Sequence, residues 1–140
     1  MTSLFGRHPY QSVFLWVGED AGYGDVTFSL DEIRFLRRLV RDSRFRNADP
    51  AFTFRIWETV RANEEKHIFP NANACDILIS TYHAYELNML RDDAIALLSA
   101  IGDDSPYRER AKDLIERLDP IEPISPAYLS NRSLFHEFFG

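Results

Sequence analysis

The stretch SLDEIRFLRRLVRDSRFR, residues 29 to 46, combines a helix start signal with regularly spaced apolar and basic side chains. Ser29 followed three residues later by Glu32 is the pattern of a capping box, in which both side chains satisfy backbone N–H groups at a helix start. At 100° per residue, the apolar side of this helix consists of Ile33, Leu36, Leu39, Val40 and Ser43. The stretch therefore predicts an amphipathic helix that packs on a core.

The opposite side of the predicted helix is basic. We call it the arginine face, and it consists of Arg34, Arg37, Arg38, Arg41 and Arg44. Residues 34–46 hold six Arg and one Asp, a charge of +5, so the rest of the chain carries −11 if the net charge is −6. Only Glu32 and Asp42 lie near enough in sequence to pair with these arginines along the helix. Two interpretations stay open: a solvated face partly paired with distant acids, or a docking surface for an acidic protein or a phosphate.

Upstream of this helix, the segments SVFLWV (12–17) and VTF (26–28) are rich in β-branched and aromatic residues. The loop GEDAGYGD (18–25) between them contains three glycines, so the pattern predicts two strands joined by a hairpin loop. Both faces of the first strand are apolar, and we therefore expect it to be covered on both sides by helices.

Downstream, Asp49 followed by Pro50 predicts the start of a second helix. Asn73 with Asp76 resembles another cap, which opens an apolar-periodic stretch through Leu90. The run DILIS, residues 76–80, is equally compatible with a short strand, and that alternative stays open.

Three further signals concern the second half of the helical region. A restart of the helix at Asp92 or Asp93 is one option, and Gly102 is expected to end it in a left-handed conformation. Ser105-Pro106 predicts the start of the last long helix, which should end before Asp119-Pro120.

The C-terminal segment begins with DPIEPISP, in which prolines recur every three residues, the period of a polyproline II helix. Apolar and aromatic side chains follow it: Tyr128, Leu134, Phe135, Phe138 and Phe139. Such a tail will be buried, either on its own chain or on a second copy in a homodimer.

Together these patterns predict an α+β fold that is mainly helical, with an N-terminal β-hairpin packed by four or five helices. We expect a single globular domain over 1–140, organised as a hairpin region (1–28), a helical region (29–118) and a Pro-rich strap with an aromatic tail and short C-terminal helix (119–140).

Motifs that would carry chemistry are missing from the sequence. The loop 18–25 matches neither a phosphate-binding pattern nor an EF-hand. Pairs such as Glu64 with His67 lack the further ligands of a metal site, so no metal or cofactor is expected. Cys75, His83 and Glu86 are the best candidates for an enzyme site, if folding brings them together.

Two features of the sequence bear on the compartment. Cys75 is the single cysteine, so no disulfide forms within the chain, and no apolar segment suggests export or membrane insertion. We therefore expect a cytoplasmic protein without a membrane partner.

For function, we expect a small acidic, non-enzymatic protein–protein interaction module, such as an inhibitor, an adaptor or an immunity-type binder. Its partner should be another protein with acidic and basic patches. Nucleic acid is disfavoured, since the chain outside residues 34–46 carries a net charge of −11, which repels the phosphate backbone. The alternatives are an enzyme or ligand-binding domain assembled in the fold, and a phosphate or nucleic-acid binder that uses residues 34–46. The expected contact residues are Tyr23, Arg34, Arg37, Arg38, Arg41, Arg44, Phe135, Phe138 and Phe139.

Overall fold

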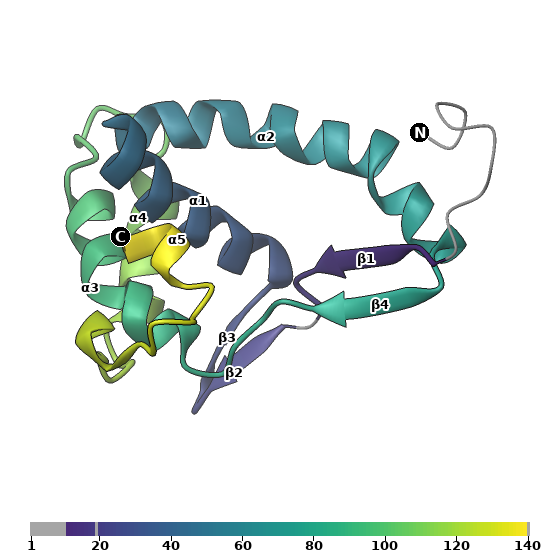
Figure 1. Cartoon of the computed structure of the whole chain (residues 1–140). Coiled ribbons are helices and arrows are strands. Elements are labelled where there is room, and N and C mark those ends of the chain that lie inside the picture. Colours follow the sequence, from purple (N-terminus) through teal and green to yellow (C-terminus); the bar gives the residue numbers. More distant parts are fainter. Residues whose placement is uncertain (1–10, 19, 140) are drawn as a thin grey trace.

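In the computed structural model, which describes residues 11–18 and 20–139, helix α1 (Leu30–Arg46) lies in the middle of the molecule (Figure 1). The predicted capping box is present: Ser29 Oγ accepts the Glu32 N–H at 3.2 Å, and Glu32 Oε2 accepts the Ser29 N–H at 3.0 Å. The helix ends at Asn47, whose φ of 49° places it in the left-handed region that Asn tolerates. The first helix is therefore confirmed at its start and along its length.

The other elements surround α1. In chain order they are β1 (Val13–Trp16), β2 (Ala21–Tyr23), β3 (Val26–Phe28), α2 (Pro50–His67), the 3-10 helix η2 (Phe69–Ala74), β4 (Ile77–Ser80), α3 (Glu86–Ser99), α4 (Arg108–Leu118), the 3-10 helix η3 (Pro126–Tyr128) and α5 (His136–Phe139). Helix α1 contacts α2, α3 and α5, and α3 packs on α4. The predicted α+β, mainly helical fold with a hairpin and a short C-terminal helix is confirmed.

The core lies between the helices. The apolar side of α1, with Ile33, Leu36, Leu39 and Val40, is buried as predicted. Phe35 of α1 adds a second contact, because its ring lies 4.6 Å from that of Phe54 and 5.6 Å from that of Trp57. Helix α1 is thus packed on more than its apolar side, and α2 is held against it by aromatic rings.

The strand pairing differs from the prediction. The hairpin is formed by β2 and β3, which pair antiparallel around Gly24, whose φ of 61° suits a two-residue turn. Strand β1 instead pairs in parallel with β4, so pairing of 12–17 with 26–28 was wrong. The reason is that the Gly-containing loop itself supplies β2, and a two-residue turn brings β2 and β3 together more easily than a longer loop would join β1 to β3.

The segment between α2 and α3 also differs. The apolar-periodic stretch from Asn73 to Leu90 is not one helix: η2 ends at Ala74, β4 follows, and α3 begins only at Glu86. The alternative of a strand in DILIS is confirmed. The segment forms a strand and not a helix because its four residues pair in register with β1, and this tertiary contact outweighs the local sequence pattern.

The later helix borders are closer to the expectation. Helix α3 continues through Asp92 and Asp93 without a restart and ends at Ser99, with Ala100 as its C-cap. Gly102 is not in the left-handed region, so the expectation that Gly102 ends this helix was wrong. Helix α4 ends at Leu118, directly before Asp119-Pro120, as predicted. No helix within the described residues is long and apolar enough to cross a membrane.

The Pro-rich strap runs along α3. Asn88 Nδ2 donates to the Glu122 carbonyl at 2.8 Å, and the Ile124 N–H donates to the Asn88 carbonyl at 3.0 Å. Beyond the strap, α5 packs on α1, with Phe135 and Phe138 buried. The strap thus positions the tail beside the arginine face.

Candidate functional site

Arg37, in the middle of the arginine face, is held by a buried carboxylate. Its guanidinium pairs with both oxygens of Glu86, with Nη2 2.6 Å from Oε2, and also donates to the Thr81 carbonyl at 2.7 Å. Glu86 is 0% exposed and also accepts the His83 N–H at 3.2 Å. This bidentate pair joins α1 to the start of α3, so Arg37 is committed to the fold.

A second carboxylate, Asp42, is buried beneath three arginines. Arg38 Nε lies 3.1 Å from Oδ2, while Arg41 Nε and Arg46 Nη1 lie 3.2 Å and 3.4 Å from Oδ1. Three guanidinium groups around one carboxylate leave an excess of positive charge at this part of α1. The surroundings of Asp42 are therefore where the arginine face is least neutralised.

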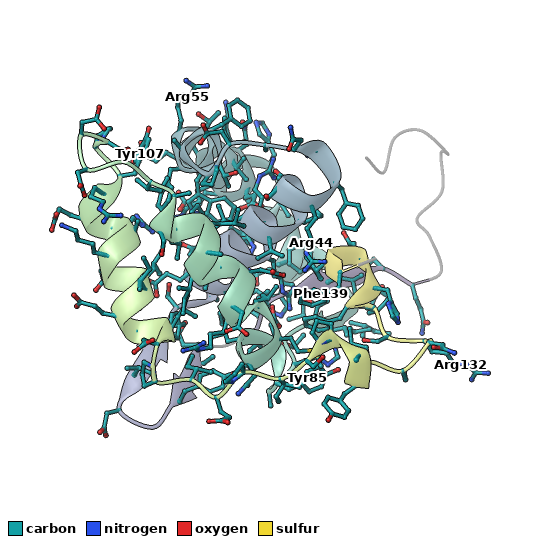
Figure 2. All side chains as sticks on the ribbon, turned by 90° about the vertical axis from the view of Figure 1, so that its left-hand side faces the viewer. Arg44, Arg55, Tyr85, Tyr107, Arg132 and Phe139 are labelled. Atoms are coloured by element: carbon teal, nitrogen blue, oxygen red, sulfur yellow. The ribbon has the colours of Figure 1, made fainter. Side chains whose placement is uncertain are left out.

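The two ends of the arginine face contact other elements. Arg34 pairs with Glu64 of α2 and lies 5.8 Å from the centre of the Trp57 ring. At the other end, Arg44 Nη2 lies 2.6 Å from Asp93 of α3, and its guanidinium lies 5.2 Å from the centre of the Phe139 ring (Figure 2). Acids from distant elements thus neutralise the arginines, and no local spacing in the sequence indicates them.

The aromatic tail packs on its own chain. The Phe135 ring lies 5.1 Å from His83 and 5.6 Å from Tyr85, and Arg37 lies 5.9 Å from the centre of the Phe138 ring. Phe139 is half-buried against Arg44. Of the expected tail contacts for a partner, Phe135 and Phe138 are therefore core residues of this chain.

Tyr23 of β2 is half-buried rather than exposed. Its hydroxyl donates to the Ala84 carbonyl at 2.6 Å and lies 3.0 Å from the Tyr82 hydroxyl. Burial, followed by the hydrogen bond with Tyr82, raises the pKa of Tyr23 above its ordinary value. The residue holds the hairpin to the segment before α3.

The candidate enzyme residues do not form one site. Strand β4 lies between Cys75 and His83, and four residues of strand span about 13 Å. The Cys75 thiol donates to the Asn71 carbonyl at 3.3 Å, and Glu86 is occupied by Arg37. In residues 11–18 and 20–139 no group of three or more His, Cys, Asp or Glu side chains is placed to hold a metal ion.

The parallel sheet of β1 and β4 carries a surface that the sequence does not indicate. Figure 1 shows this sheet at the end of the molecule opposite α3 and α4. Parallel register places Val13 beside Ile77 and Leu15 beside Ile79, so all four side chains share one face. We call this the sheet face. Its side chains are between 39% and 63% exposed, which corrects the expectation that helices cover β1 on both sides.

The sheet face is apolar and lies outside the main core, whose buried cluster contains no residue of β1 or β4. Its geometry is fixed at one end by Asp76, whose Oδ2 accepts the Ser12 N–H at 2.8 Å and the Ser12 hydroxyl at 2.9 Å. These hydrogen bonds lower the pKa of Asp76. Four aliphatic side chains on one face of the paired strands are thus exposed to solvent.

Comparison with family models, with curated proteins and with solved structures finds no match to this chain. What the protein does must therefore be argued from its own geometry.

Proposed function

We propose that this protein is a non-enzymatic protein–protein interaction module, of the inhibitor, adaptor or immunity type, and that the sheet face contacts its partner. The exposure of Val13, Leu15, Ile77 and Ile79 on one face of a parallel sheet supports the proposal most. Parallel sheets are normally covered on both faces, and contiguous exposed apolar patches mark interaction sites. A cover supplied by another protein would complete this sheet.

The partner should combine an apolar centre with a basic rim. The chain has a net charge of −6, and the arginines of α1 are paired with the chain's own acids. The remaining acidic surface attracts basic groups, which speeds the encounter and selects against acidic proteins. The apolar contact then supplies most of the binding energy, because the sheet face itself carries no charge.

Docking through the arginine face receives less support than the sequence suggests. Arg37 is held by a buried glutamate, and Arg34 and Arg44 pair with acids of α2 and α3. An acidic partner or a nucleic acid would have to displace these carboxylates. The sheet face requires no such displacement.

Affinity capture with matched variants tests the proposal. Tagged wild-type protein is compared in its native lysate with a double variant, Leu15→Ser and Ile79→Ser, and with two controls, Tyr128→Ser and Arg38→Gln. Tyr128 is the control for an exposed apolar residue elsewhere, since it lies in η3.

The proposal expects one stoichiometric partner that the sheet variant loses and both controls retain. Loss in Arg38→Gln with retention in the sheet variant would show docking through the arginine face instead. Retention by all four proteins would contradict both surfaces.

A further inference from the structure

A pocket of about 420 Å³ lies between α1, α2 and the tail. One wall is basic, formed by Arg34, Arg37, Arg38 and Arg41 of α1. The rest of the lining is largely apolar and includes Leu15 of β1, Val60 of α2, and Leu134, Phe135 and Phe138 of the tail. A cavity of this size, with an apolar lining and a few convergent polar groups, is typical of small-molecule sites.

Buried polar atoms without hydrogen-bond partners concentrate at this pocket. In the part of the chain that the structure describes there are four such side-chain atoms, and three belong to lining residues: Arg38 Nε, Trp57 Nε1 and Glu64 Oε2. Trp57 is 5% exposed, so its indole N–H is removed from bulk water. Because buried donors are nearly always satisfied, the Trp57 N–H marks a position for an acceptor.

The arginines on the wall differ in how many of their donors are used. Arg37 donates to Glu86 and to both oxygens of Thr81, and Arg34 pairs with Asp31 and Glu64. Among the described residues Arg38 forms an ion pair only with Asp42, and that ion pair lacks hydrogen-bond geometry. Arg38 therefore retains its two terminal nitrogens for a planar, bidentate acceptor.

The tail already places one oxyanion on this wall. The Glu137 carboxylate lies 3.5 Å from Arg41 Nη1, in the longest ion pair of α1, and its side chain is 63% exposed. An exposed pair of this length contributes little stability, so another anion can displace it. Glu64 pairs with Arg34, and Glu86 behind the wall pairs with Arg37. Arg38 shares its one acidic partner, Asp42, with Arg41 and Arg46, so the positive charge is least neutralised beside Arg38.

We infer that this pocket binds a small organic anion, with its carboxylate or phosphate group on Arg38 and Arg41 and its apolar body against the tail. The Trp57 N–H donates to the same ligand, and Glu64 Oε2 accepts from any donor it carries. The proposed protein partner is not involved. The pocket shares one lining residue, Leu15, with the sheet face, and the variants that test the anion site leave Leu15 unchanged, so the two proposals are tested separately.

The test follows the Trp57 indole N–H cross-peak in NMR, assigned by its persistence in Trp16→Phe, since the chain has two tryptophans. Inorganic phosphate and 3-phenylpropionate are titrated as the two oxyanion types, with 2-phenylethylammonium as a cation that carries the same ring. We expect a saturable shift with at least one anion, and none with the cation. The more effective anion identifies the head group.

Two variants and one control locate the anion. Arg38→Gln should weaken binding about tenfold or more, because a charge-assisted hydrogen bond is lost. Arg46→Gln is the matched control, since Arg46 also contacts Asp42 but does not line the pocket, and it should leave the affinity unchanged. Glu137→Gln should tighten binding about two- to fivefold, because it removes the competing carboxylate.

A merely structural role for Arg38 would not explain a higher affinity of the Glu137→Gln variant for the anion, because Glu137 pairs with Arg41 and not with Arg38. The inference is overturned if neither anion gives a saturable shift at millimolar concentration, if Arg38→Gln and Arg46→Gln weaken binding equally, or if Glu137→Gln leaves the affinity unchanged.

Discussion

The arginine face of α1 and the sheet face of β1 and β4 differ in how far the chain itself covers them. Each arginine of α1 contacts a carboxylate of the same chain, supplied by α1 itself, α2, α3 or α5. The four side chains of the sheet face are covered by no comparable element. A single acid from any direction can neutralise an arginine, whereas an apolar strand face needs a whole packed layer. Availability for binding therefore follows from tertiary contacts and not from charge.

The sharpest test of the arginine face removes a buried partner. Glu86→Ala should lower the free energy of unfolding by about 3–5 kcal/mol, because it leaves Arg37 uncompensated between α1 and α3. Urea unfolding followed by circular dichroism measures the change. Glu137→Ala removes an exposed partner of the same face and should change stability by less than about 1 kcal/mol. Equal effects would mean that burial does not distinguish these pairs.

The tail tests whether the arginine face is covered within one chain. Phe135→Ala should destabilise the protein by about 3 kcal/mol, at the low end for a buried Phe, because the tail can detach while the rest stays folded. Its neighbour Leu134 is 73% exposed, so Leu134→Ala should stay within about 0.5 kcal/mol. Thermal and urea unfolding of both variants measure the difference. A neutral Phe135→Ala would show that the tail is not anchored on this core.

Low pH should destabilise the sheet of β1 and β4 before the helices, because protonation of Asp76 weakens its hydrogen bonds with Ser12. Its lowered pKa means that the folded state favours the carboxylate, so its contribution is complete above the ordinary value of about 3.9 and is lost as the pH falls below it. Amide exchange of β1 and β4 should therefore increase at low pH in the wild type. In Asp76→Asn the same exchange should already be raised at neutral pH, and equal protection in both proteins would contradict this role.

The smallest effect is expected on the sheet face. Leu15→Ala should change the free energy of unfolding of the isolated chain by no more than about 0.5 kcal/mol, because the side chain is mostly exposed. Leu36→Ala is the matched control on the buried side of α1 and should cost about 2–5 kcal/mol. A loss above 2 kcal/mol in Leu15→Ala, measured by urea unfolding, would mean that the chain covers this face itself.

Local signals predicted α1 and the start of α2 well, because a cap and the first turn depend on residues next to each other. Ser29 and Glu32 form their box as the spacing requires, and Asp49 caps α2 through the Ala51 N–H. Such contacts need no knowledge of the rest of the fold.

Long-range partners were not predictable in the same way. Val13 pairs with Ile77 although the hairpin, α1, α2 and η2 lie between them in the sequence, and nothing near either residue specifies the other. The partner of Arg37 is Glu86, which the sequence pattern groups with His83 instead. Hence the predictions from the sequence overestimated the unpaired positive charge of α1 and underestimated the exposed apolar area of β1.

Site-specific photo-cross-linking tests the central claim most directly. A photoreactive amino acid replaces Leu15 in the native cell, and the matched control carries it at Tyr128, which is also exposed but lies in η3. The account predicts one strong adduct to a different protein from position 15 and none from position 128. An adduct of two copies of this chain would reassign the sheet face to a homodimer, and no adduct, or equal adducts from both positions, would contradict its role as the contact surface.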